Sequence, residues 1–146
     1  MAANEALTPR VFIVRHGETE WALIGRQTGK TDLDLTPAGV SQVRSTAASI
    51  VGPGKLLDLD RLARVFVSPR KRALQTLQCL TAGRWGEESD VAADERVTVT
   101  EDIAEWDYGD YEGLTVEDIR RGRSERGLDE TGKVWNVWRD GCEGGE

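Results

Sequence analysis

Two stretches of the chain carry continuous apolar residues, and amphipathic segments follow each of them. Residues 11–14 (Val-Phe-Ile-Val) are typical of a strand buried on both faces of a sheet, and residues 65–67 (Val-Phe-Val) repeat this pattern in a shorter form. Residues 96–100 alternate weakly and are rich in Val and Thr, so they predict a third strand. The polar stretch 17–35 predicts a long functional loop.

Three segments of the chain have the sequence pattern of a helix. A helix is predicted over 37–51, with Thr36 as its N-cap, because proline at the first helical position and a stripe of apolar residues support it. A second helix is predicted over 69–80 with Ser68 as its N-cap, and a short one follows Thr115. Strands that alternate with helices predict an α/β fold with a largely parallel sheet.

Composition narrows the class of protein. The chain has 146 residues, of which 31% are charged and 38% apolar, as expected for one soluble globular domain over residues 1–146. No apolar run approaches about 18 residues, and no basic segment leads into an apolar one near the start, so we expect neither a membrane partner nor secretion. Cys79 and Cys142 are far apart and fit two reduced thiols. We expect a cytoplasmic protein, with the nucleus as a further location.

Charge is unevenly distributed along the sequence. The net charge is −7, yet residues 1–86 carry 12 basic and 7 acidic side chains, whereas residues 87–146 carry 7 and 19. An acidic chain without a basic stripe is not expected to bind nucleic acid. A small anion held by a few basic residues of the first half remains compatible with this pattern.

Arginines follow two of the predicted strands. Arg15 and His16 come directly after the first, and Arg70 and Arg72 come after the second. Ligands of open α/β sheets bind at the carboxyl ends of the strands, and a helix N-terminus favours an anion. Two guanidinium groups can hold a phosphate bidentately, and a histidine beside them can attack phosphorus if a backbone carbonyl orients its other nitrogen.

Four motifs occur in order along residues 11–114. They are "RHGETEW", "TGKTDLDLTPAG", "SPRKRALQT" and "EWDYGDYEG", and together they resemble the histidine phosphatase superfamily, which has the phosphoglycerate mutase-like fold. The tail "WNVWRDGCEGGE" resembles the fungal sedoheptulose-1,7-bisphosphatase branch of that superfamily. The resemblance implies a three-layer α/β/α fold with a mainly parallel sheet.

The resemblance also implies roles for particular residues. His16 would be the nucleophile that forms phosphohistidine, and Arg15 and Arg72 would hold the phosphoryl group. Glu105 would protonate the leaving alcohol as general acid. Substrate contacts would come from Thr28, Gly29, Arg70 and Tyr108, with Arg70 a candidate for a second phosphate. The implied reaction is hydrolysis of a small phosphorylated metabolite, such as a sugar bisphosphate, without cofactor or metal.

The sequence departs from the family in one respect. His16 is the sole histidine, so the family's second catalytic histidine has no counterpart here. We therefore expect a chain that is incomplete at its C-terminus, with weak or no phosphatase activity. A mutase-type phosphoryl transfer and a non-catalytic phosphate-binding fragment stay open as alternatives. A nucleotide-binding P-loop at 25–31 fits poorly, because the pattern requires glycine where Ile24 stands.

Overall fold

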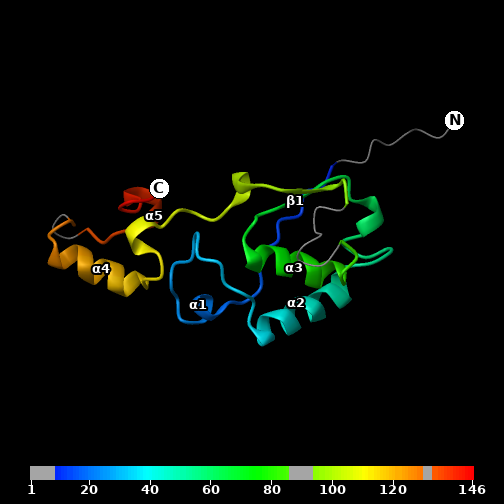
Figure 1. The fold of residues 1–146 in the computed structure, drawn as a ribbon, viewed down its shortest axis with the longest axis horizontal. Helices are drawn as coiled ribbons and strands as arrows, with labels where there is room; N and C mark the ends of the chain where they lie inside the picture. Colours follow the sequence, from blue (N-terminus) through cyan, green and yellow to red (C-terminus); the bar gives the residue numbers. More distant parts are fainter. Residues whose placement is uncertain (1–8, 86–93, 130–132) are drawn as a thin grey trace.

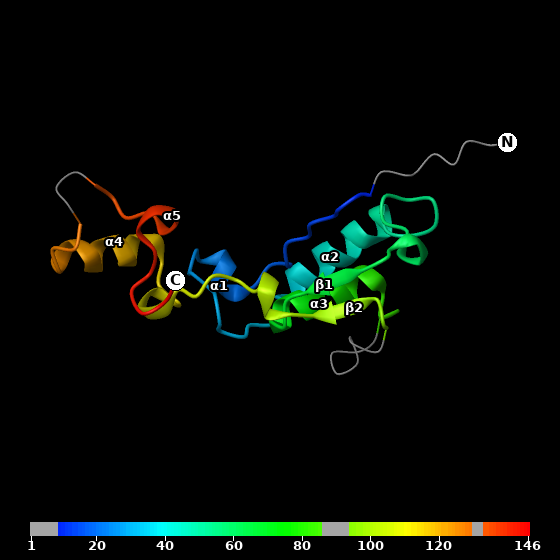
Figure 2. The ribbon, with the colours of Figure 1, turned by 90° about the horizontal axis from the view of Figure 1, so that it is seen from above.

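The computed structural model describes residues 9–85, 94–129 and 133–146. The α-helices of the described residues are α1 (Glu20–Leu23), α2 (Pro37–Ile50), α3 (Lys71–Thr81), α4 (Val116–Glu125) and α5 (Val137–Asp140). Figures 1 and 2 show an elongated molecule with a small sheet and the helices α2 and α3 at one end and the helices α4 and α5 at the other. Short 3₁₀ helices span Leu59–Arg61, Glu101–Ile103 and Gly109–Tyr111.

The sheet consists of two parallel strands connected through α3. Strand β1 (Val65–Val67) pairs with β2 (Val97–Val99), in a register that places Val65 opposite Val97. Both strands fall where the apolar pattern predicts them, and their parallel pairing confirms the α/β prediction. Helix α3 packs on β1 and on α2. Its N-terminus lies at the carboxyl end of β1, because the strand ends at Val67 and the helix begins at Lys71.

The residues at the helix starts explain where two of the helices begin. The side-chain oxygen of Thr36 accepts a hydrogen bond from the N–H of Gly39, and Thr115 accepts one from Asp118. Each bond satisfies a peptide donor that the helix itself leaves unpaired. Both N-caps were predicted from the sequence and are confirmed.

The predicted start of the α3 helix is wrong by two residues. The helix begins at Lys71 rather than Pro69, and Ser68 is not its N-cap. The carboxylate of Asp32 accepts the N–H of Lys71 at 2.9 Å and so caps the helix from a distant loop. That loop is also more ordered than predicted, because Thr19 caps the one-turn helix α1 within it.

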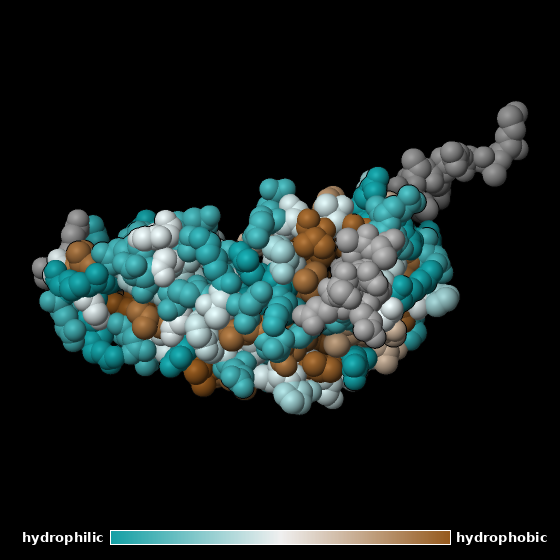
Figure 3. All heavy atoms as spheres, viewed as in Figure 1, coloured by the Kyte–Doolittle hydropathy of each residue, from teal (hydrophilic) through white to brown (hydrophobic). Residues whose placement is uncertain are grey.

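The first predicted strand is not formed. Residues 11–14 carry no strand assignment, and Val11 and Ile13 are 86% and 94% exposed. An apolar run forms a buried strand only where neighbouring strands accept its peptide groups, and the described part of the chain provides no ladder here. Figure 3 shows exposed apolar side chains on the face that this segment crosses.

Two apolar clusters lie at opposite ends of the molecule. Beside the sheet, Leu59, Val67, Trp85 and Val97 are buried. At the other end, Ile119 of α4 packs with the aromatic rings of Tyr111 and Trp135, whose centroids lie 5.4 Å apart. No helix within the described ranges is long and apolar enough to cross a membrane.

Removing the Ile119 side chain tests the second cluster. Ile119 is 1% exposed, so Ile119→Ala creates a cavity and should lower the free energy of unfolding by about 2–4 kcal/mol. Ile103→Ala is the matched control, because Ile103 is 52% exposed and its loss should cost less than about 1 kcal/mol. Urea denaturation followed by tryptophan fluorescence measures both values, and equal losses would contradict the packing described here.

Candidate active site

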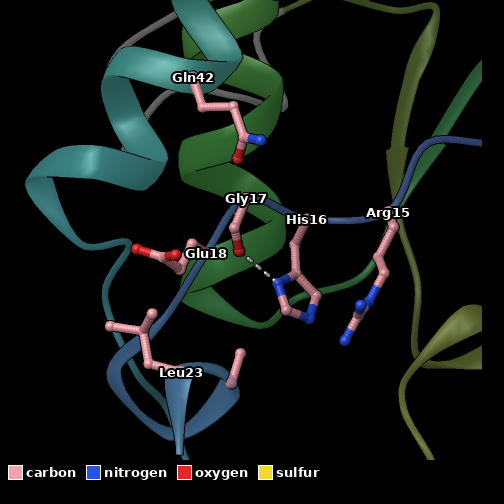
Figure 4. Close-up of a pocket in the computed structure, with 7 residues that line it drawn as sticks. Arg15, His16, Gly17, Glu18, Leu23 and Gln42 are labelled. Atoms are coloured by element: carbon pink, nitrogen blue, oxygen red, sulfur yellow. Dashed lines mark hydrogen bonds between the residues drawn. The ribbon is translucent and has the colours of Figure 1, made fainter.

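Arg15 and His16 line a cleft of about 380 Å³ where the N-terminal segment passes between α1 and α2. Figure 4 shows their side chains next to each other and directed to the same side of the backbone. The remaining wall of the cleft is formed by Gly17, Glu18, Ala22, Leu23 and Gln42. The cleft therefore combines a cation and an imidazole with an apolar wall from α1.

A backbone carbonyl fixes the orientation of the imidazole. Nδ1 of His16 lies 2.7 Å from the carbonyl oxygen of Gly17, which accepts only, so the proton of the neutral ring sits on Nδ1. The lone pair of the ring is then on Nε2, which Figure 4 shows on the Arg15 side of the ring. This is the carbonyl contact that a nucleophilic histidine requires.

The surroundings of His16 favour its neutral form. Burial lowers the pKa of the imidazole below 6.5, and the charges of Arg72 and Arg15 lower it further. The hydrogen bond to Gly17 and the carboxylate of Glu105 act in the opposite direction without reversing the shift. His16 is therefore predominantly neutral, and able to act as a nucleophile, at pH 7.

Arg72 is almost completely buried, with 1% of its surface exposed. Its guanidinium donates hydrogen bonds to the carbonyl oxygens of Thr28, Gly29 and Thr31 at 3.0, 2.9 and 3.0 Å. Burial lowers the pKa of Arg72, while the charge of Glu105 acts against this. The arginine thus ties the loop 28–31 to the first turn of α3.

The carboxylate of Glu112 holds the same loop through its N–H groups. It accepts hydrogen bonds from Gly29 at 2.9 and 3.0 Å and from Thr31 at 2.9 Å. A Cβ at Gly29 would collide with the carbonyl oxygen of Trp106 and lie 3.2 Å from the ring of Tyr108, so only glycine fits here. The loop is therefore clamped between a guanidinium that binds its carbonyls and a carboxylate that binds its amides.

Glu105 and Tyr108 belong to the same group of side chains. The charge of Glu105 raises the pKa of His16 and of Arg72, and after burial it is the largest contribution that raises the pKa of Tyr108. Glu105 itself is exposed, and its carboxylate accepts a hydrogen bond from the N–H of Trp106 at 3.1 Å. An accessible carboxylate in the field of His16 is suited to exchange protons with a bound substrate.

Arg70 stands at the N-cap position of α3 and is oriented by an ion pair. Its guanidinium donates to Glu101 at 3.1 Å, and its Nε is buried without a hydrogen-bond partner. Its charge also acts on Arg72, which places the two guanidinium groups near each other. Arg70 thus adds a cation at the edge of the cluster.

The structure brings the eight residues predicted for the site into one region. The predicted proximity of His16 and Arg72 holds, since the N–H of Gly17 donates to Thr76, one turn beyond Arg72 on α3. Sequence reasoning missed Thr76, Glu112 and the capping carboxylate of Asp32. All three lie inside the quoted motifs "SPRKRALQT", "EWDYGDYEG" and "TGKTDLDLTPAG", and that position was the only signal available.

No group of His, Cys, Asp and Glu side chains suited to a metal ion occurs among residues 9–85, 94–129 and 133–146. The charged groups around His16 are instead guanidinium groups and single carboxylates, of which Arg72, Arg70 and Glu105 have hydrogen-bond partners. The arrangement suits an anion with several oxygens, because guanidinium N–H groups match those oxygens.

Comparison with known proteins shows which family the chain belongs to. The sequence profile of the histidine phosphatase superfamily (branch 1) matches residues 11–146. The chain belongs to the histidine phosphatase superfamily. This confirms the resemblance drawn from the four motifs, and the match includes every residue assigned to the site.

Individual members of the superfamily are similar over most of this chain. The sedoheptulose 1,7-bisphosphatase of Saccharomyces cerevisiae is 46% identical over 141 residues, which are 97% of this chain and 51% of that protein. An acid phosphatase of Mycobacterium tuberculosis is 39% identical over 137 residues, which are 94% and 55%.

A solved structure of a Mycobacterium tuberculosis open reading frame product superposes with a TM-score of 0.61 at 34% identity. The superposition covers 90% of this chain and 54% of the other, and it confirms the phosphoglycerate mutase-like α/β fold. This histidine phosphatase chain thus spans about half the length of the relatives it matches.

Replacing Glu112 tests the clamp on the loop. Glu112→Ala removes a charged acceptor of three amide contacts, so it should lower the free energy of unfolding by about 1–3 kcal/mol. Hydrogen exchange at the amides of Gly29 and Thr31 should accelerate in this variant. Glu117→Ala, which removes an exposed carboxylate of α4, is the control and should leave these two amides unchanged. Unchanged exchange in Glu112→Ala would disprove the clamp.

Proposed function

We propose that this chain provides the nucleophile half of a phosphomonoesterase that acts on a small phosphorylated metabolite through a phosphohistidine intermediate. One observation carries the proposal: the Gly17 carbonyl holds the Nδ1 proton of His16, which leaves the Nε2 lone pair facing the cleft beside Arg15. Membership of the superfamily supports the same reaction. A cytoplasmic location is part of the proposal.

The reaction takes place in two steps. In the first, Nε2 of His16 attacks phosphorus, the bond from phosphorus to the ester oxygen breaks, and Glu105 gives its proton to the leaving alkoxide. In the second, water attacks phosphorus, Glu105 takes a proton from that water, and the phosphorus–nitrogen bond breaks to release phosphate. Arg15 stabilises the charge on the phosphoryl oxygens in both transition states, and Arg72 contributes through its field.

A sugar bisphosphate is the substrate class that we favour. Arg70 provides a cation beside the cluster for a second phosphate, and its buried Nε is a donor without a hydrogen-bond partner. The 46% identity to a sedoheptulose 1,7-bisphosphatase supports the same class. Thr28, Gly29 and Tyr108 are proposed to contact the sugar, since the clamped loop brings Gly29 against the Tyr108 ring.

We also propose that these 146 residues alone turn substrate over weakly. The superfamily's reaction uses a second histidine to hold the phosphoryl group, whereas His16 is the sole histidine of this chain. The chain corresponds to about half the length of two phosphatase relatives. Formation of phosphohistidine is therefore a sharper test than steady-state turnover.

Incubation with a sugar bisphosphate that carries radioactive phosphate tests the proposal directly. We expect an acid-labile label on the wild-type chain and none on His16→Ala, because the chain has no other histidine. Phosphate binding without a label would favour a non-catalytic binding fragment. If the label passes to a second sugar phosphate faster than to water, the chain is a mutase-type transferase.

The proposed binding of a second phosphate by Arg70 can be tested with a matched control variant. Arg70→Ala should reduce labelling by the bisphosphate and leave labelling by a monophosphate nearly unchanged. Lys71→Ala removes an exposed neighbouring cation and should affect neither substrate. Equal reductions with both substrates would contradict the second-phosphate role of Arg70.

The lowered pKa of His16 predicts how labelling depends on pH. Only the neutral imidazole attacks phosphorus, and the folded protein lowers the pKa of His16 below 6.5. Protonation of His16 should therefore make the labelling rate decline as the pH falls through this lowered pKa. NMR titration of the single imidazole should give the same midpoint.

Substitution of Arg15 tests how much the nearby cations contribute to the lowered pKa of His16. Arg15→Gln removes one of the cations that lower the pKa of His16, so it should move the NMR midpoint upward. Arg120→Gln removes an exposed cation of α4 and is the control without an expected effect. A wild-type midpoint at or above 6.5 would be inconsistent with the site described here.

A further inference from the structure

The peptide N–H of Gly17 is buried and has a side-chain partner on α3. It donates a hydrogen bond of 2.9 Å to Oγ1 of Thr76, although 59 residues separate the two in sequence. Thr76 is 4% exposed and lies one helical turn beyond Arg72. A buried peptide donor requires such a partner, since an unpaired one is costly.

The Thr76 hydroxyl links this contact to the body of the helix. It donates to the carbonyl oxygen of Arg72 at 2.7 Å, so the hydroxyl has a defined orientation and presents a lone pair to Gly17. The carbonyl oxygen of Gly17 in turn accepts a hydrogen bond from Nδ1–H of His16 at 2.7 Å. A continuous chain of hydrogen bonds therefore runs from α3 to the imidazole.

Val43 of α2 and Leu35, which precedes that helix, close the other side of Gly17. A Cβ built on this glycine would lie 2.9 Å from Cγ2 of Val43 and 3.2 Å from Cδ1 of Leu35. Gly17 is thus pressed against apolar side chains on one side and bonded to Thr76 on the other. Loss of the Thr76 bond would leave contact with α2 as the restraint on this residue.

We propose that Thr76 is a positioning residue for His16: by accepting the N–H of Gly17, its hydroxyl fixes the carbonyl that selects the Nδ1–H form of the imidazole. Orientation of the ring follows from the observed hydrogen bonds alone. Its consequence for phosphoryl transfer rests on the proposed function, in which Nε2 attacks phosphorus.

The sole histidine makes the effect directly measurable. With ¹⁵N-labelled histidine, NMR of the wild-type chain near neutral pH should show predominantly the Nδ1–H tautomer. Thr76→Val keeps the shape of the side chain but removes the hydroxyl, so it should give a mixture of tautomers. Exchange of the Nδ1 proton with water should become at least about ten-fold faster. Thr76→Ser retains the hydroxyl and should stay within about two-fold of wild type.

Thr81→Val provides the matched control. Thr81 is also a buried threonine of α3, 5% exposed, and its hydroxyl donates to the carbonyl of Leu77 rather than binding near His16. This variant loses a comparable buried hydroxyl and should keep the wild-type tautomer. The same tautomer change in Thr81→Val would overturn the proposal, because any weakening of α3 would then be sufficient.

Two further results decide the proposal. Thr76→Val with the wild-type tautomer disproves it. If Thr76→Val does not fold, exchange of the Gly17 amide in the wild-type chain decides instead: protection by at least about a hundred-fold supports the bond, and exchange at the rate of an open peptide overturns it.

Labelling of His16 separates this inference from the proposed function. We expect incorporation of phosphate to fall at least about ten-fold in Thr76→Val and to recover in Thr76→Ser, since small displacements of a reacting group are costly. A wild-type chain that takes no label contradicts the proposed function, whereas the tautomer result still decides the role of Thr76. Equal incorporation of phosphate in the wild-type chain and in Thr76→Val would show that Thr76 does not position the nucleophile.

Discussion

The burial of the Arg72 guanidinium is the interaction on which the arrangement of this site depends. A cation withdrawn from water is stable only where dipoles and opposite charges replace the lost hydration. Three carbonyl oxygens of the loop 28–31 supply the dipoles, and the carboxylates of Glu105, Asp32 and Glu112 act on its charge. Because these groups come from residues 28–32 and 105–112, both distant from Arg72 in the sequence, the arginine can be buried only when the three segments converge.

Local sequence signals predicted the elements whose causes are local. Thr36 and Thr115 cap their helices through bonds that span three residues, and the apolar run 65–67 forms a strand. Residues 11–14 carry an even stronger strand pattern, yet Val11, Ile13 and Val14 are exposed, since a strand also requires neighbours that the run itself does not specify. The start of α3 was misplaced for a similar reason, because its cap is Asp32 from a distant loop.

The same distinction between local and distant causes applies to the residues of the candidate site. The arginines and His16 that follow the predicted strands indicated an anion pocket, and the other site residues were assigned through the resemblance of four ordered motifs to a known family. Thr76 and Glu112 escaped attention because their functions depend on which peptide groups they meet, namely the N–H of Gly17 and those of Gly29 and Thr31. A threonine within a helix and a glutamate in an acidic segment give no sign of such partners in the sequence.

The arginines of the site differ in what their N–H groups are free to do. Both terminal nitrogens of Arg72 donate to loop carbonyls, so direct contact with a phosphoryl group would use Nε or require an exchange of partners. Arg15 instead lines the open cleft beside the imidazole. The first role of Arg72 in this structure is therefore to shape the loop and to act on His16 through its charge, with Arg15 the accessible donor.

The choice of a carbonyl rather than a carboxylate as the partner of Nδ1 has an electrostatic consequence. A carboxylate in that place would orient the ring equally well, but it would stabilise the imidazolium and raise its pKa. The neutral carbonyl of Gly17 orients the ring at a smaller electrostatic cost, so burial and the two arginines still lower the pKa of His16. A histidine that attacks phosphorus at neutral pH, as we propose for His16, needs both a fixed tautomer and an available lone pair. The contacts that hold Gly17 between α2 and α3 provide the first without sacrificing the second.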